Sequence, residues 1–239
     1  MNHQSVDQQP AYLIHRRPYR ETGLLLDVLT PAYGLKGLVA HGARRSNSPL
    51  AGLLQPNRPL LVSWRGRGEL GAVRAVDSAG PAFRLTGRAL WCGLYLSELI
   101  QRLLDREEPC PELFAHYQQA LDKLQYSDGD SASEQAVLRA FERRLLDVLG
   151  YGLILDVTGD TAEPLQANSN YRYQPDAGAL AVGKGVAVSG RSLLAIARDD
   201  YTDPGVREDA KRLMRACLAV HLGGKPLVSR ALFGAPEAT

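Results

Sequence analysis

The first third of the chain alternates short apolar runs with turn residues. Five runs have the length of β-strands and are separated by Gly, Pro and other turn formers. We predict strands at Ala11–Arg17, Gly23–Thr30, Leu35–His41, Arg58–Trp64 and Glu69–Val76. In the second run Leu24, Leu26 and Val28 share one face, as a barrel interior requires, while Leu25 and Leu29 make the other face partly apolar. Five strands in about 70 residues predict a small closed barrel, typically a nucleic-acid-binding OB-fold.

Beyond Gly80-Pro81 the apolar residues recur about every 3.6 positions, which is the period of a helix. The first predicted helix runs from Thr86 to Leu104, and a second one ends at about Gln125. Three more are predicted, from Ser131 to Leu149, from Ser192 to Arg198 and from Pro204 to His221. Thr86, a capping box at Ser131-Ala-Ser-Glu134 and Asp203 are the expected N-terminal caps.

Residues 153–189 lack this period and are rich in Gly, Pro, Asn and Asp. We predict a small irregular insert there, with β-like pieces at Tyr171–Gln174 and Ala179–Val182. The predicted fold class is therefore α+β. A five-stranded OB-fold barrel in residues 1–80 is followed by an α-helical domain in residues 81–239, which carries the insert.

The charge is distributed unevenly along the chain, although the net charge of its 239 residues is only +2. Residues 1–80 contain 10 Lys and Arg against 5 Asp and Glu, a net charge of +5. Residues 81–239 contain 18 against 21, a net charge of −3. The basic character therefore belongs to the predicted barrel, where it favours a polyanionic partner.

The sequence contains no run of 18 apolar residues and no basic-then-apolar leader, which predicts a cytoplasmic protein without a membrane partner. Its three cysteines, Cys92, Cys110 and Cys217, have no C-x-x-C spacing. We therefore expect neither a disulfide framework nor a structural zinc site, and each cysteine should be a small buried apolar residue.

Two basic turns flanked by glycine lie in the predicted barrel. Gly42-Ala-Arg-Arg45 follows the third strand, and Trp64-Arg-Gly-Arg-Gly68 joins the last two. Glycine lets a bulky ligand approach the backbone, and the guanidinium fork matches phosphate oxygens, so these turns suit a nucleic-acid backbone. The other interpretation is a pair of solvated hairpin loops. The predicted DNA-contacting residues are Lys36, His41, Arg44, Arg45, Arg65, Arg67 and Arg74.

No motif indicates catalysis. Gly183-Lys-Gly185 and Gly223-Gly-Lys-Pro226 lack the spacing and the Ser or Thr of a phosphate-binding loop, and the histidines are scattered singly. We predict a protein that is not an enzyme and that needs no cofactor or metal. A nuclease or phosphotransferase stays open only if carboxylates cluster in space. An RNA-binding OB-fold protein without sequence preference is the alternative among binding proteins.

The helix from Glu134 to Leu149 combines arginine with an apolar stripe. Arg139 and Arg143 are spaced i, i+4 beside Phe141 and Leu145, an arrangement that can receive an acidic peptide. The other interpretation is a solvated face in which these arginines pair with Glu142 and Asp147.

Four segments, in this order, resemble the RecO family of bacterial DNA repair and recombination mediators, and the resemblance spans nearly the whole chain. They are Arg17-Pro-Tyr-Arg-Glu-Thr22, Gly42-Ala-Arg-Arg45 leading to Leu53-Leu-Gln-Pro56, Leu138-Arg-Ala-Phe-Glu142 leading to Leu149-Gly-Tyr-Gly152, and Leu222-Gly-Gly-Lys-Pro226. The resemblance implies binding of single- and double-stranded DNA and annealing of complementary strands. It also implies a nucleoid-associated protein that loads RecA together with RecR and the single-stranded DNA-binding protein SSB.

The resemblance further implies a pocket for the acidic, hydrophobic C-terminal tail of SSB. Arg139 would be its charge partner, and Phe141, Arg143 and Leu145 would complete the site. The chain departs from the family pattern in two places. Many RecO-like proteins carry four zinc-ligating cysteines in the insert, but Leu153 to Val188 contains none, so we expect no zinc. Asn57 stands where an aromatic residue commonly follows Leu-Gln-Pro, which argues against base stacking there.

Overall fold

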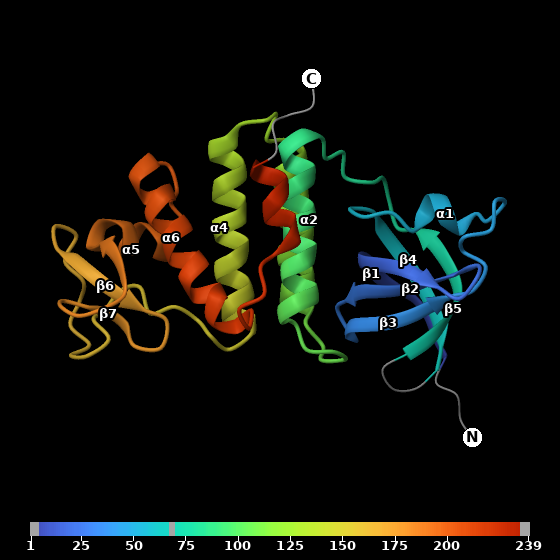
Figure 1. Cartoon of the computed structure of the whole chain (residues 1–239), viewed down its shortest axis with the longest axis horizontal. Coiled ribbons are helices and arrows are strands. Elements are labelled where there is room, and N and C mark those ends of the chain that lie inside the picture. Colours follow the sequence, from blue (N-terminus) through green and yellow to red (C-terminus); the bar gives the residue numbers. More distant parts are fainter. Residues whose placement is uncertain (1–4, 67–69, 235–239) are drawn as a thin grey trace. The chain divides into compact units, whose positions relative to one another are not determined.

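The computed structural model describes residues 5–66 and 70–234 and contains two compact units (Figure 1). The described parts of residues 1–126 and 227–239 form the first, called here the barrel unit. Residues 127–226 form the second, the helical unit. The predicted domain boundary at residue 80 lies inside the barrel unit and stays a prediction.

Five strands close the barrel in the order β1-β2-β3-β5-β4, which confirms the predicted OB-fold-like architecture. Their bounds are β1 Ser5–Tyr19, β2 Gly23–Thr30, β3 Gly34–Ala40, β4 Pro59–Arg65 and β5 Leu70–Ser78. β3 and β5 pair in parallel, and the other pairs are antiparallel. β1 is longer than predicted because its N-terminal half pairs with β4 and its C-terminal half with β2.

The barrel interior is filled by the face of β2 that the sequence predicted. Leu24, Leu26 and Val28 pack there with residues such as Leu38 and Trp64. The connection from β3 to β4 contains a single helical turn, α1 Leu50–Leu53, which the sequence did not indicate.

Two helices of the barrel unit, α2 Gly87–Leu103 and α3 Pro111–Gln125, pack on the outside of the barrel. The ring of Tyr12 in β1 lies 5.1 Å from Phe114 and 5.2 Å from Tyr117, centroid to centroid. Both helices were predicted, but the Thr86 side chain makes no capping hydrogen bond.

The C-terminal 3-10 helix, η1 Val228–Gly234, returns to α2. The Phe233 ring lies 6.0 Å from Trp91. The Glu98 carboxylate accepts hydrogen bonds from the backbone nitrogens of Val228 and Ser229 at 2.7 and 2.8 Å. Partial burial would raise the pKa of the Glu98 carboxyl, but the bonds from Ser229 and Val228 outweigh it and lower that pKa. One ionised side chain thus joins two segments about 130 residues apart.

The helical unit contains three helices and a small sheet. Their bounds are α4 Ser131–Val148, β6 Asn170–Gln174, β7 Gly178–Leu180, β8 Val186–Ser189, α5 Gly190–Ala197 and α6 Pro204–His221. The sheet has the order β7-β6-β8. The insert is therefore more ordered than predicted, and its strand β8 was not among the predicted β-like pieces.

Carboxylates cap the two long helices of the helical unit. Asp203 accepts from the backbone nitrogens of Gly205 and Val206, as predicted. The expected capping box at Ser131 is wrong, because the preceding residue, Asp130, accepts from the nitrogens of Ala132 and Ser133.

All three cysteines are buried and free, as predicted. Within residues 5–66 and 70–234, no helix is long and apolar enough to cross a membrane.

Gly34 is expected to tolerate no side chain. Its φ is +58°, and a Cβ placed there would lie 2.0 Å from the carbonyl oxygen of Glu108. Gly34→Ala should therefore lower the free energy of unfolding by at least about 2 kcal/mol. Gly52→Ala is the matched control, because a Cβ there meets no atom within 4 Å. Urea unfolding followed by circular dichroism measures both, and equal stability of the two variants would contradict the packing of Glu108 on the barrel.

Candidate nucleic-acid interface

The loop that follows β3 presents two arginines from an anchored turn. Ala43 is 1% exposed and belongs to the barrel core, whereas its neighbours Arg44 and Arg45 are exposed. The turn closes through the Arg45 nitrogen, which donates to the Gly42 carbonyl at 3.1 Å, with Gly42 at a φ of +69°. The buried alanine fixes the backbone, so both guanidinium groups project from a defined position.

This loop is joined to the turn between β1 and β2. The Arg44 nitrogen donates to the Thr22 carbonyl at 2.9 Å. Arg20 lies in that turn, exposed, with its guanidinium carbon 5.2 Å from the centre of the Tyr19 ring. Sequence reasoning missed Arg20, although three consecutive antiparallel strands bring the end of β1 and the end of β3 to the same end of the barrel.

Arg65 and His41 extend the basic character across the sheet. His41 is exposed directly after β3. Arg65 pairs with Ala72 of β5, which in turn pairs with Val39 of β3. Adjacent strands lie about 4.8 Å apart, so the backbone of Arg65 is about 10 Å from the end of β3.

Arg74 lies beside Arg65. It sits where the β4–β5 register shifts, and its Nη1 donates to the Ser5 hydroxyl at 3.1 Å, while Ser5 pairs with Arg65. Asp7 is 3.9 Å from the guanidinium and balances part of its charge. We call Arg20, His41, Arg44, Arg45, Arg65 and Arg74 the basic surface of the barrel. Arg67, also predicted as a DNA contact, lies outside the described residues.

Lys36 has a different role from the one predicted. It is 6% exposed and forms an ion pair with Glu107, in the link between α2 and α3. Asp27 of the neighbouring strand β2 also pairs with this link, because Arg106 donates to its carboxylate at 2.8 Å. Lys36 therefore ties β3 to the link between the two helices, and we no longer propose it as a DNA contact.

The residues predicted for the SSB tail lie in a buried part of α4. Arg139 is 7% exposed and pairs with Glu142 at 3.0 Å, while Phe141 and Leu145 are 2% and 0% exposed. The expectation of an open cleft bordered by Arg139 is therefore wrong, because these side chains are buried. The periodicity placed these residues on one stripe, but it did not show that the arginine at its border would be buried as well.

Arg143 is committed to carboxylates within the helical unit. Its Nε and Nη2 donate to the two oxygens of Asp199 at 3.0 and 2.7 Å, and Arg144 adds a bond of 2.8 Å. Partial burial would raise the pKa of the Asp199 carboxyl, but the hydrogen bonds from Arg143 and Arg144 outweigh it and lower that pKa. Arg143 also lies 3.5 Å from Asp147, so the pairings of the alternative interpretation are present.

A second feature of the helical unit is an apolar cavity of about 540 Å³. Exposed Tyr151, Ile154 and Val220 line it, and the Tyr151 ring stacks on His221 with the ring centres 3.9 Å apart. Its described lining contains Asp176 but no lysine or arginine. The cavity suits an apolar side chain but offers no strong cation to an acidic peptide.

No group of three or more His, Cys, Asp or Glu side chains in the described part of the chain could hold a metal ion. In the insert, the sheet buries the side chains of Tyr171, Tyr173 and Val188, which are 6%, 1% and 3% exposed. An apolar core thus holds the sheet of the insert together.

Arg139→Ala is expected to destabilise the protein. The substitution removes the ion-pair partner of Glu142, which is 0% exposed, and breaking a buried pair usually costs about 3–5 kcal/mol. Urea unfolding measures the change, and Arg198→Ala, at an exposed position, is the control with the same loss of charge. A loss below about 0.5 kcal/mol would show that Arg139 is not a structural residue.

We expect the purified protein to hold no stoichiometric zinc and to keep its thermal stability in chelator, because Leu153 to Val188 contains no cysteine. Elemental analysis and unfolding curves with and without chelator test this. One zinc per chain, with unfolding on its removal, would contradict the prediction.

Comparisons with known proteins cover almost the whole chain. The family model "Recombination protein O N terminal" matches residues 1–82, and "Recombination protein O C terminal" matches residues 84–231. The DNA repair protein RecO of Nitrosococcus oceani is 46% identical over 228 residues, which are 94% of this chain and 91% of that protein. The RecO of Methylococcus capsulatus is 46% identical over 224 residues, 93% and 91% of the two chains. The RecO of Pseudomonas aeruginosa PAO1 is 46% identical over 228 residues, 94% of each chain. The chain therefore belongs to the RecO family of DNA repair proteins.

Proposed function

We propose that this RecO protein is a recombination mediator that binds single- and double-stranded DNA and anneals complementary strands. Together with RecR it helps to load RecA onto single-stranded DNA coated with SSB. Membership of the family supports the role in repair, and the basic surface of the barrel supports the contact with DNA.

The observation that carries the proposal is the gathering of arginines from separate turns on one barrel. Arg20 comes from the turn between β1 and β2, Arg44 and Arg45 from the loop after β3, and Arg65 from the end of β4. Guanidinium groups bind phosphate oxygens with two parallel hydrogen bonds, whatever the base sequence. The described barrel offers no helix shaped to enter a major groove, so the predicted binding is sequence-tolerant.

Annealing follows from charge neutralisation. Two strands repel each other through their phosphates, and arginines that neutralise part of that charge lower the repulsion, so base pairing can proceed. This requires no nucleotide hydrolysis, no cofactor and no catalytic side chain, which is why we propose that the protein is not an enzyme.

The proposed partners are DNA, RecR and the SSB tail, with RecA acting downstream, in the cytoplasm and at the nucleoid. We still propose that the SSB tail docks on the helical region of this chain. We no longer propose Arg139 and Arg143 as its first contacts, because both already pair with carboxylates.

The DNA contact is tested by salt dependence. Replacing Arg44 and Arg45 with alanine should reduce the slope of log K against log salt for single-stranded DNA by about one to two, one contact per arginine. Fluorescence anisotropy of a labelled oligonucleotide measures the slope. A double variant of Arg84 and Lys123, both exposed and outside the basic surface, loses the same charge and should leave the slope nearly unchanged.

Two results would speak against this account. If both double variants lower the slope equally, binding depends on net charge alone and not on the arginines of the barrel. If RNA of the same sequence binds more tightly than DNA, the alternative of an RNA-binding OB-fold protein is favoured.

A further inference from the structure

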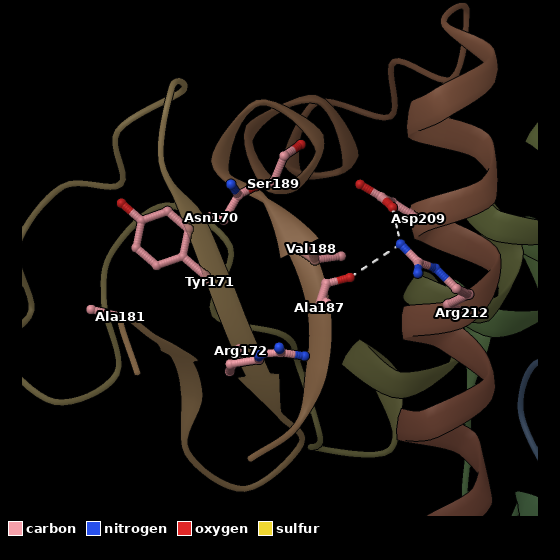
Figure 2. Close-up of a pocket in the computed structure, with 9 residues that line it drawn as sticks. All are labelled: Asn170, Tyr171, Arg172, Ala181, Ala187, Val188, Ser189, Asp209 and Arg212. Carbon is pink, nitrogen blue, oxygen red and sulfur yellow. Dashed lines mark hydrogen bonds and ion pairs between the residues drawn. The ribbon is translucent and has the colours of Figure 1, made fainter. Parts of the chain in front are cut away.

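The helical unit contains a polar cavity of about 460 Å³ between its sheet and α6 (Figure 2). Asn170 and Arg172 of β6 line it, together with Ser189 at the end of β8 and Arg212 of α6. Asn170, Arg172 and Arg212 are exposed, so a ligand can reach the cavity from solvent. The residues predicted from the sequence for DNA or for SSB are absent from this lining.

Arg212 is held in a fixed position on one side of the cavity. Its Nη2 donates to the carbonyl oxygen of Ala187 at 3.1 Å and also pairs with Asp209 (Figure 2). Both bonds use Nη2, so the other N–H groups of the guanidinium stay available to a ligand. The bond to Ala187 also covers the outer edge of β8, which would otherwise present an unpaired carbonyl.

Arg172 supplies the second guanidinium. It pairs with Ala187 across the β6–β8 ladder, so Ala187 is the neighbour of both arginines. Figure 2 shows the Arg172 side chain extending from β6 in the direction of α6. Within the described residues the Arg172 side chain makes no hydrogen bond and no ion pair, in contrast to that of Arg191, which pairs with Asp203.

The chemistry of the cavity fits an anion with several oxygens. Two guanidinium groups and one carboxylate, Asp209, leave one net positive charge, and the Asn170 amide adds two donors. The apolar lining consists of small or buried side chains, namely Ala181, Ala187 and Val188, which give little hold to the large apolar residue of a peptide. The Tyr171 ring is buried and points away from Arg172 in Figure 2, so it offers no platform to a base.

We propose that this cavity binds a backbone phosphate of a nucleic-acid strand, with Arg172 and Arg212 as the anion ligands. The proposal rests on the proposed function, because it takes DNA as the polyanion. It adds a second contact, on a different unit of the chain from the basic surface of the barrel.

The test compares Arg172→Ala with wild type and with Arg198→Ala, an exposed arginine that does not line the cavity. Loss of one phosphate contact should reduce the slope of log K against log salt for single-stranded DNA by about 0.7. Arg198→Ala should leave it unchanged. Arg172→Lys, which keeps the charge but loses the fork, should restore most of the slope but only part of the affinity. Thermal unfolding checks that each variant is folded.

Phenylglyoxal modification of the full-length protein gives an independent readout. Oligo(dT) should protect Arg172 from modification and leave Arg198 reactive. No protection of Arg172, or equal slopes for Arg172→Ala and wild type while the Arg44 and Arg45 variant is impaired, would overturn this inference alone. Failure of the wild type to bind DNA would overturn the proposed function as well. Loss of binding to an acidic peptide with unchanged DNA binding would reassign the cavity to a protein partner.

Discussion

The outer surface of β2 and β3 is apolar and has to be covered, and this requirement determines how the α2–α3 link packs on the barrel. Leu29 and Leu35 lie on that surface and are 0% and 1% exposed. The link between α2 and α3 covers it, and the ion pairs of Asp27 with Arg106 and of Lys36 with Glu107 fix the position. One side of the barrel is thereby closed to ligands. Exposed basic residues remain in the turns, on β1 and on the β4–β5 side, and the proposed DNA contacts are those of the turns and of the β4–β5 side.

In both units, ionised side chains at the borders of apolar surfaces hold neighbouring segments together. Glu98 holds η1 on α2 in the barrel unit, and Asp199 holds Arg143 and Arg144 in the helical unit. Each carboxylate accepts two or more hydrogen bonds, which compensates its partial removal from water. Arg143 and Arg144 thus pair with a carboxylate and stabilise the fold, whereas Arg44 and Arg45 have no carboxylate partner within the described residues and are left for a polyanion.

The strands and helices were predictable because their signals are local. The alternation in Gly23–Thr30 and the cap at Asp203 depend on neighbours within a few residues. The burial of Lys36 was not predictable, because its partner Glu107 is 71 residues away and belongs to a link without periodicity. For Arg139 the pairing with Glu142 was visible as an alternative, but its burial was not. Arg20 was missed because strand pairing, not sequence distance, brings its turn beside Arg44.

The central claim is that this protein brings strands together by neutralising their backbones. Annealing of complementary DNA strands that are each coated with SSB tests it most directly. The account predicts that the purified protein accelerates annealing without added nucleotide, and that the acceleration declines steeply as salt is raised. An annealing rate no higher than that of the coated strands alone, or one that does not depend on salt, would contradict it.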